Sequence, residues 1–404
     1  MKIKGFFEDI RGASRVTELR RENFREAPDT PIRPDPIRKL SDQLHPGRRP
    51  YYITDIRKSS ETAKTFRFEP VDGHIPPFQA GQYVSFSLAI GSSVLTRPYS
   101  ISSAPYQARG QKPFFEVTIR RKPGGFASEW FLEQAEVGMK LEADLPFGQF
   151  YYEPLRDAPR IVAIAGGAGI TPFVSMAKEI AWGNLDLDLT ILYGSKVHTD
   201  IVCAKELAEA ENTAREKRSN DLYFKGSVKT IPVMEDDPWW PGESGLITRE
   251  LIERYSDGDT SFFFCGPQPM FPYISNIMKE MGVSGRRFRK DTASQPADAS
   301  KIPGFPKDQI GKTYKITVVR GIQEEEIPAR ADEPVAVSLE RAGIKMDTHC
   351  RGGECGYCRS RLLSGDLFVS PLGDGRRAED KEMGWFHACS SYPMSDVKIK
   401  IAIL

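Results

Sequence analysis

The sequence predicts a multidomain protein: an antiparallel β-barrel, then an α/β domain with a doubly wound parallel sheet, then a third, smaller domain. Three observations lead to this prediction: the chain length, a change of hydrophobic pattern along the chain, and a cysteine-rich segment near the C-terminus. A chain of 404 residues corresponds to about three domains of roughly 150 residues each. We expect an N-terminal extension over 1–50, domains over 51–157, 158–285 and 312–404, and a linker over 286–311.

The composition is that of an ordinary globular chain, with 40% hydrophobic and 27% charged residues. Lys and Arg number 56 and Asp and Glu 55, so the formal net charge is only +1. This balance argues against nucleic acid as an electrostatic partner. The longest apolar run, Ile161–Ile170, is interrupted by three glycines and falls short of the roughly 18 residues that a membrane span needs. The N-terminal residues are too acidic for a secretory signal, so we expect a cytoplasmic protein with no membrane span.

The N-terminal extension combines scattered apolar residues with many charges, which predicts one short amphipathic helix. The proline-rich stretch APDTPIRPDP that follows predicts an extended connector. Two interpretations of this arm stay open: it packs across the later domains, or it docks a partner protein.

Residues 51–153 have the pattern of a small antiparallel barrel, because short apolar runs alternate with Pro and Gly turns at close spacing. A helix is expected near Ser128–Ala135. The expected strands are YYITDI, KTFRFEP, QYVSFSLAI, FFEVTIRR and MKLEADLP.

Residues 160–282 alternate between buried strands and amphipathic helices, which implies a parallel, doubly wound sheet. The expected strands are RIVAIAG, DLTILYG, LYFKGSV and SFFFCG, and the expected helices are ITPFVSMAKEIAW, VCAKELAEAEN, ITRELIERY and MFPYISNIMKEM. The polar, proline-bearing stretch 286–311 reads as a linker. TYKITVVRG then opens the last domain, and VKIKIAIL closes it.

The cysteine-rich segment has the C-x4-C-x2-C…C spacing of a plant-type [2Fe–2S] site, for which soft thiolate ligands are suited. A disulfide framework does not suit a cytoplasmic chain, and zinc sites normally show two paired motifs instead. Glycines between the cysteines allow the loop to wrap a cluster and to turn N–H groups toward its sulfurs. The expected ligands are Cys350, Cys355, Cys358 and Cys389, and the glycines are Gly352, Gly353 and Gly356.

The run HCRGGECGYCRSRLLSGD, followed by FHACSSYP, resembles the plant-type ferredoxin domain that is appended to flavin-dependent electron-transfer reductases. The resemblance implies an α+β, β-grasp ferredoxin fold for residues 312–404.

A second resemblance lies in the barrel region, where RPYS follows an expected strand and is similar to the R-x-Y-S flavin motif of the ferredoxin–NADP reductase superfamily. A guanidinium can pair with a flavin phosphate, a tyrosine can stack on the flavin ring, and a serine hydroxyl can bond near its N5. The alternative is an arginine that pairs with a surface acid beside a packed tyrosine. The residues are Arg97, Pro98, Tyr99 and Ser100.

A glycine turn then leads into the expected helix, and such a turn presents free N–H groups to a phosphate. In the family that it resembles, this G-x-x-S element contacts the pyrophosphate of FAD. FMN stays open, since relatives with a C-terminal ferredoxin module include an FMN-using branch resembling phthalate dioxygenase reductase. The residues are Gly124, Gly125, Phe126, Ala127 and Ser128.

GGAGITP follows a strand and opens a helix, where glycines permit the close approach of a pyrophosphate. It lacks the full G-x-G-x-x-G fingerprint and instead resembles the G-G-x-G-x-T-P run of the same superfamily, in which the threonine lies near flavin and nicotinamide. A purely structural strand–helix turn is the alternative. The residues are Gly166, Gly167, Gly169, Thr171 and Pro172.

Downstream, Cys265, Gly266 and Pro267 resemble the C-G-P element that places a cysteine beside the nicotinamide ring. No neighbouring base is evident, so the expected role of Cys265 is positioning. Cys203 reads as a buried core cysteine. The loop YGSK contributes Ser195 and Lys196 as candidate coenzyme contacts; the choice between NADH and NADPH stays open, with a slight preference for NADH.

The resemblance implies an NAD(P)H-dependent oxidoreductase that passes electrons through flavin and a [2Fe–2S] cluster to a terminal oxygenase or another acceptor redox protein. Its expected catalytic residues are Ser100, Thr171 and Cys265. Two alternatives remain: a stand-alone reductase of free flavin, ferric iron or quinones, and a non-enzymatic electron-relay subunit.

Overall fold

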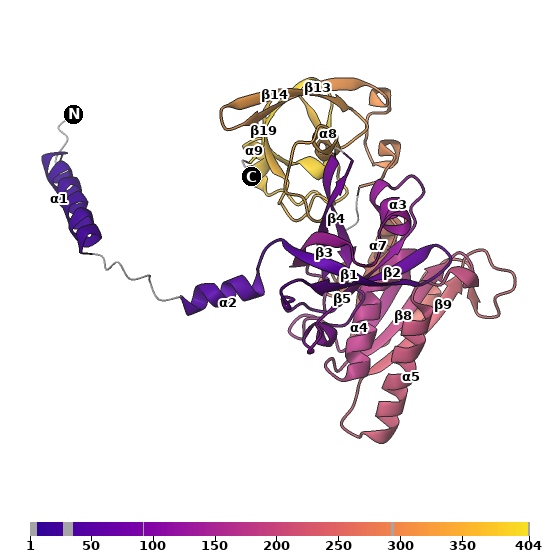
Figure 1. Ribbon diagram of the computed structural model, residues 1–404. Coiled ribbons are helices and arrows are strands. Elements are labelled where there is room, and N and C mark those ends of the chain that lie inside the picture. Colours follow the sequence, from indigo (N-terminus) through magenta and orange to yellow (C-terminus); the bar gives the residue numbers. More distant parts are fainter. Residues whose placement is uncertain (1–5, 27–34, 92, 292–294, 403–404) are drawn as a thin grey trace. The chain divides into compact units, whose positions relative to one another are not determined.

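The computed structural model describes residues 6–26, 35–91, 93–291 and 295–402 (Figure 1). The chain divides into two compact units, residues 1–44 and 45–404, and each is considered by itself. None of the helices in these ranges is long and apolar enough to cross a membrane.

The N-terminal unit contains two helices where one was predicted. Helix α1 spans Phe6–Arg25, and α2 spans Pro36–Leu44. The second helix was missed because its prolines indicated extended chain, yet proline is favoured at the first position of a helix. The Asp35 carboxylate accepts a 2.9 Å hydrogen bond from the Ile37 N–H and caps the helix. Most of the predicted connector lies outside the described residues, and both interpretations of the arm stay predictions.

The first domain of the larger unit is an antiparallel barrel with strand order β4-β3-β6-β1-β2-β5. A bridge between Ile101, just after β4, and Val117 in β5 closes the barrel. Helix α3 (Phe126–Glu133) begins two residues earlier than predicted. The strands are β1 (Arg49–Lys58), β2 (Ala63–Pro70), β3 (Tyr83–Ile90), β4 (Ser93–Ser100), β5 (Phe115–Arg120) and β6 (Lys140–Phe147).

The second domain is a parallel sheet with strand order β10-β9-β8-β7-β11-β12, and its helices cover both faces. Because β7 and β11 are neighbours, the strand order reverses between them, which is where ligands of such sheets bind. The strands are β7 (Arg160–Gly166), β8 (Asp188–Ser195), β9 (Ser227–Met234), β10 (Glu243–Ser244), β11 (Thr260–Cys265) and β12 (Phe288–Lys290). The helices are α4 (Thr171–Trp182), α5 (Ala204–Asn220), α6 (Arg249–Arg254) and α7 (Met270–Glu280).

Two predicted boundaries in this part of the chain are wrong. The strand expected at LYFKGSV begins only at Ser227, and Leu222 and Tyr223 are 98% and 91% exposed. Pro232 lies inside β9 and masked the strand pattern, since proline is rare within sheets. The predicted linker is not wholly a connector, because its residues Phe288–Lys290 form the last strand of the sheet.

The third domain is a five-stranded sheet with order β14-β13-β19-β15-β17, in which β13 and β19 are parallel. Ala299, Ile302 and Phe305, from the second half of the predicted linker, pack with Tyr392 of this domain. The mixed sheet agrees with the predicted β-grasp fold. The elements are β13 (Thr313–Arg320), β14 (Gln323–Arg330), α8 (Val335–Arg341), β15 (Arg359–Ser364), β16 (Leu367–Val369), α9 (Ala378–Glu382), β17 (Trp385–His387), β18 (Ser391–Pro393) and β19 (Val397–Lys400).

Candidate functional site

The RPYS motif lies at the end of strand β4 itself, rather than after a strand as predicted. Ser100 is paired with Tyr83 of β3 across the sheet, and the Tyr99 ring packs between Phe86 and Phe131. Burial raises the pKa of Tyr99, so its hydroxyl stays protonated. Pro98 lies between these residues in the same strand.

Arg97 contacts the third domain as well as its own. Its guanidinium donates to the Thr96 carbonyl (2.7 Å) and lies 3.5 Å from the Glu340 carboxylate, which also pairs with Arg351. Burial and the neighbouring Arg351 charge lower the pKa of Arg97 to about 10. Arg97 therefore remains a cation at neutral pH. The alternative interpretation was an arginine that pairs with a surface acid. Arg97 does pair with an acid, but Glu340 is buried and belongs to another domain.

The glycine turn before α3 leaves the start of this helix open. No side chain caps the helix, and Gly124 has a φ of +69°, a conformation that glycine adopts readily. A Cβ on Gly125 would lie 2.6 Å from the Ser128 hydroxyl oxygen, so no side chain fits there. Phe126 and Ala127 form the first turn of the helix. The Gly124 and Gly125 N–H groups are already bonded, to the Glu129 carboxylate (2.9 Å) and the Lys122 carbonyl (2.7 Å), so it is the uncapped first turn of α3 that suits a phosphate.

The two glycine-bearing motifs of the parallel sheet touch each other where the strand order reverses. A Cβ on Gly166 would lie 2.7 Å from Pro267, and one on Gly169 would overlap the Cys265 carbonyl, 2.8 Å from the Gly266 nitrogen. Between them, Gly167 has a φ of +53°. These glycines therefore let the two motifs pack directly against each other, since the space that a side chain would need is already filled by the protein. Thr171 begins α4 and donates to the Ala168 carbonyl (3.0 Å), and Pro172 follows in the first turn.

Cys265 ends strand β11, and its thiol lies 3.3 Å from the Asp291 carboxylate. Burial and the Asp291 charge raise the pKa of Cys265 well above the ordinary thiol value. A protonated thiol is a poor nucleophile, which fits the predicted positioning role. Asp291 was missed because it lies in the predicted linker, where no motif marks it.

The two predicted coenzyme contacts at the end of β8 differ in their exposure to solvent. Lys196 is exposed, whereas Ser195 is buried with its hydroxyl 3.3 Å from the Asp200 carbonyl. The structure therefore does not bring Ser195 and Lys196 to one surface. Cys203 is buried, as predicted, and its N–H donates to the Ser59 hydroxyl of the barrel domain (3.0 Å).

Asp200 joins the barrel to the parallel-sheet domain. Its carboxylate accepts hydrogen bonds from the hydroxyls of Ser60 (2.5 Å) and Thr62 (2.8 Å) and pairs with Arg120. The Arg120 guanidinium also lies against Gly167, where a Cβ would come within 2.6 Å of it. The sequence carries no motif for these residues, because they lie far apart along the chain.

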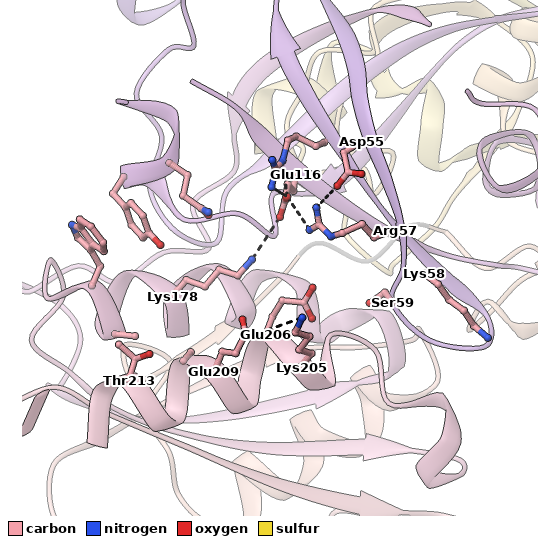
Figure 2. Close-up of a pocket in the computed structure, with 16 residues that line it drawn as sticks. Asp55, Arg57, Lys58, Ser59, Glu116, Lys178, Lys205, Glu206, Glu209 and Thr213 are labelled. Atoms are coloured by element: carbon pink, nitrogen blue, oxygen red, sulfur yellow. Dashed lines mark hydrogen bonds and ion pairs between the residues drawn. The ribbon is translucent and has the colours of Figure 1, made fainter. Parts of the chain in front are cut away.

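A groove of about 710 Å³ separates the barrel from helices α4 and α5 (Figure 2). On its floor, Glu116 is buried and accepts from Arg57 (2.9 Å) and Arg67 (3.1 Å). Lys178 of α4 lies 3.7 Å from the same carboxylate, on the other wall of the groove. Sequence motifs marked none of these residues.

The four cysteines of the C-terminal motif converge on one loop. Cys350 is within hydrogen-bonding reach of Cys355 and Cys389, and Cys358 of Cys389. The Cys350 sulfur accepts N–H groups from Gly352 and Cys355, each at 3.4 Å. Cys350, Cys358 and Cys389 are buried, and Cys355 is exposed. The thiols thus meet the donor set, the proximity and the N–H contacts that a [2Fe–2S] cluster requires.

The loop geometry supports that assignment. A Cβ on Gly353 (φ +89°) would lie 2.5 Å from the Ser390 hydroxyl, so the loop closes only with glycine there, while Gly356 (φ +79°) turns the chain between two cysteines. Among the described residues, no three or more His, Cys, Asp or Glu side chains are arranged to hold a metal ion.

All three domains line one cavity of about 530 Å³ beside this loop. The barrel contributes Tyr83 and Phe147, the parallel-sheet domain contributes Asp291, and the cysteine loop contributes Cys350 and Cys355. Tyr83 is the cross-strand partner of Ser100, and Asp291 contacts Cys265. Of the predicted site residues, Cys350 and Cys355 line this cavity, and the flavin and nucleotide motifs border it through their neighbours Tyr83 and Asp291.

Aromatic and threonine contacts hold the cysteine loop on the barrel. The Thr96 hydroxyl hydrogen-bonds to Thr348, and the Phe147 ring lies 4.2 Å from the His349 ring, which lies 4.0 Å from Tyr357. Burial lowers the pKa of His349 to about 4, so the ring is neutral at pH 7. His349 and Tyr357 directly precede two of the cysteines and lie inside the run HCRGGECGYC, but the sequence did not predict them as site residues.

Three family models match successive parts of the chain. An oxidoreductase FAD-binding domain matches residues 50–152, an oxidoreductase NAD-binding domain 163–276, and a 2Fe-2S iron-sulfur cluster binding domain 319–394. The chain is 24% identical over 365 residues to the glycine betaine monooxygenase reductase subunit of Chromohalobacter salexigens, covering 88% of this chain and 95% of that protein. It is 26% identical to the NADH oxidoreductase HCR of Escherichia coli, covering 80% and 88%. The solved phthalate dioxygenase reductase, a modular structure for electron transfer from pyridine nucleotides to [2Fe–2S], aligns with TM-score 0.61 and 19% identity over 89% of this chain and 98% of that one.

Proposed function

This chain belongs to the ferredoxin–NADP reductase type of oxidoreductase, with FAD-binding, NAD-binding and C-terminal [2Fe–2S] domains, and we propose that it passes electrons from NADH to a partner oxygenase or another terminal redox protein. The observation that carries the proposal is the cavity at which the residues of all three domains meet. The oxygenase as acceptor rests on similarity to proteins named as reductases of a monooxygenase and a dioxygenase.

When bound, the coenzyme supplies two electrons as hydride, the flavin converts two-electron to one-electron transfer, and the cluster carries single electrons. The chain's own residues hold these groups. Arg97 offers a cation to the flavin phosphate, and the uncapped first turn of α3 offers N–H groups. Tyr99 and Ser100 supply a ring and a hydroxyl at the end of β4.

The parallel-sheet domain receives the coenzyme at the strand reversal. Gly166, Gly167 and Gly169 bring the two glycine-bearing motifs into contact and leave their backbone without side chains, and Thr171 and Cys265 border the same point. Burial, together with the Asp291 charge, keeps the Cys265 thiol protonated, so this side chain orients the nicotinamide and does not attack it. Cys350, Cys355, Cys358 and Cys389 would hold the cluster.

We also propose a cytoplasmic location. All six cysteines are free thiols, four of them in a cluster motif, which suits a reducing compartment.

The test is anaerobic titration of the purified full-length chain with NADH, followed by absorbance of the flavin and of the cluster. We expect both chromophores to bleach, and the cluster to transfer its electrons to an added one-electron acceptor such as cytochrome c. Bleaching of the flavin alone would contradict the proposed route and would favour a stand-alone flavin reductase.

A further inference from the structure

Helix α4 presents one face to the segment that directly follows the flavin motif. Ser175, Lys178, Glu179 and Trp182 are spaced i, i+3, i+4 and i+7, so they lie on one side of the helix. The segment that they contact, residues 102–106, begins two residues after Ser100.

Each of the four side chains makes a contact with that segment. The Ser175 hydroxyl donates to the Ser103 carbonyl (2.7 Å), and the Lys178 ammonium donates to the Ser102 carbonyl (3.2 Å). The Glu179 carboxylate accepts from the Tyr106 N–H (3.3 Å). The Trp182 ring stacks on the Tyr106 ring at 4.3 Å and 11°.

The Ser175–Ser103 hydrogen bond is shielded from water, and the other two polar contacts are partly buried. Ser175 and Ser103 are fully buried, and Glu179 is 5% exposed. A shielded hydrogen bond is costly to leave unmade, so these ties resist sliding of the helix along the segment. Lys178 is additionally held by the buried Glu116 across the groove in Figure 2.

The helix starts at one predicted catalytic residue, and the segment begins two residues after another. Thr171 is the first residue of α4, one helical turn before Ser175, and Ser100 ends β4. A helix rises only 1.5 Å per residue and is stiff over this length. A contact at Ser175 and Trp182 therefore fixes where Thr171 lies relative to Ser100.

We propose that Ser175, Lys178, Glu179 and Trp182 act as positioning residues, which set the separation of the nicotinamide from the flavin by clamping α4 to residues 102–106. The clamp rests on the proposed function, since it orders the coenzyme against the flavin of that same site. Hydride transfer needs reacting atoms about 3–3.5 Å apart, and a displacement of about 1 Å costs on the order of a hundredfold in rate.

The test uses Trp182→Ala and Ser175→Ala in the full-length protein with its flavin and cluster. Trp182 is 57% exposed, so its removal leaves the core intact. We expect flavin reduction by NADH to slow about tenfold or more, with the KM for NADH changed less than about twofold. We also expect the long-wavelength charge-transfer absorbance of nicotinamide stacked on flavin to weaken. Trp182→Phe, which keeps a stacked ring, should restore both.

Thr213→Ala is the matched control, because Thr213 is exposed on α5 and lines the same groove without touching residues 102–106 in any contact of the structure. If Trp182→Ala and Ser175→Ala both behave like Thr213→Ala, the proposed positioning role is wrong. A loss of charge-transfer absorbance in Trp182→Ala but not in Trp182→Phe would support it. Failure of NADH to reduce the flavin of the unaltered protein would instead contradict the proposed function itself.

Discussion

The barrel meets its two neighbouring domains through very different junctions. Toward the parallel-sheet domain the contacts are polar, buried and numerous, with Asp200 bonded to Ser60, Thr62 and Arg120 and α4 tied to residues 102–106. Toward the third domain there are fewer polar contacts, namely a buried Thr96–Thr348 hydrogen bond and the Arg97–Glu340 and Arg48–Asp347 pairs, and the Phe147 ring contacts His349 and Tyr357.

The difference follows the chemistry proposed for each junction. Hydride transfer moves a nucleus and requires close, aligned reactants, so the junction that aligns them is specified at many points. Electron transfer to a cluster moves no atom, and fewer contacts suffice to keep the cysteine loop beside the barrel. This explanation can be tested by perturbing either junction and measuring whether flavin reduction by NADH or cluster reduction by the flavin becomes slower.

The largest effect is expected from Cys358→Ser, which replaces a buried ligand in the third domain. A serine hydroxyl is a much poorer ligand than a thiolate, so the cluster absorbance and cytochrome c reduction should both be lost. Flavin reduction by NADH should persist, as followed by ferricyanide reduction. Ser364→Ala, at an exposed site of the same domain, should change neither. Equal loss of both activities would mean that the two junctions are not separable.

Asp200→Asn weakens the junction between the barrel and the parallel-sheet domain. Burial raises the pKa of Asp200, but hydrogen bonds from Ser60 and Thr62 and the Arg120 charge outweigh it, so the pKa lies below its ordinary 3.8. The carboxylate therefore stabilises the fold above about pH 4, and this contribution is lost as the pH falls through the folded pKa.

We expect Asp200→Asn to lower the free energy of unfolding by about 1–3 kcal/mol at pH 7, with a smaller difference below pH about 4. Urea unfolding at several pH values measures this. The exposed pair Asp308–Lys312 provides a control, since Asp308→Asn should cost less than about 0.5 kcal/mol. A difference for Asp200→Asn that does not depend on pH would show that its charge is not what matters.

Phe147→Leu perturbs the other junction. It removes the ring contact with His349 but keeps an apolar side chain, so a loss of about 0.5–1.5 kcal/mol in stability is expected. Stopped-flow absorbance should show slower reduction of the cluster by the flavin, with flavin reduction by NADH unchanged. Slower flavin reduction by NADH would instead contradict this prediction, because it would mean that Phe147 acts at the junction with the parallel-sheet domain.

The smallest effect is expected from Lys196→Ala. Lys196 is exposed after β8, where a cation favours the 2′-phosphate of NADPH. The KM for NADPH should rise a few-fold, and the KM for NADH should stay nearly constant. An equal change in both KM values would show that Lys196 does not contact the 2′-phosphate.

The sequence by itself determined the parts of the site that are contiguous along the chain. The cysteine spacing, RPYS, GGAGITP and CGP each place several contacts within a few residues, and local patterning identified the barrel and the strand–helix alternation around them. Such features depend on ligand chemistry and backbone conformation, which short segments already specify. Local pattern failed at β9 and β12, where Pro232 hid one strand and a short, charged segment hid the other.

Only the tertiary structure decided which distant residues share a site. Asp291 reaches Cys265 because β12 returns beside β11, and Asp200 reaches Arg120 because two domains pack together. The pairing of Arg97 with Glu340 joins residues that no pattern relates. These contacts arise from burial and charge satisfied across the whole fold, so no stretch of the chain carries a local signal for them.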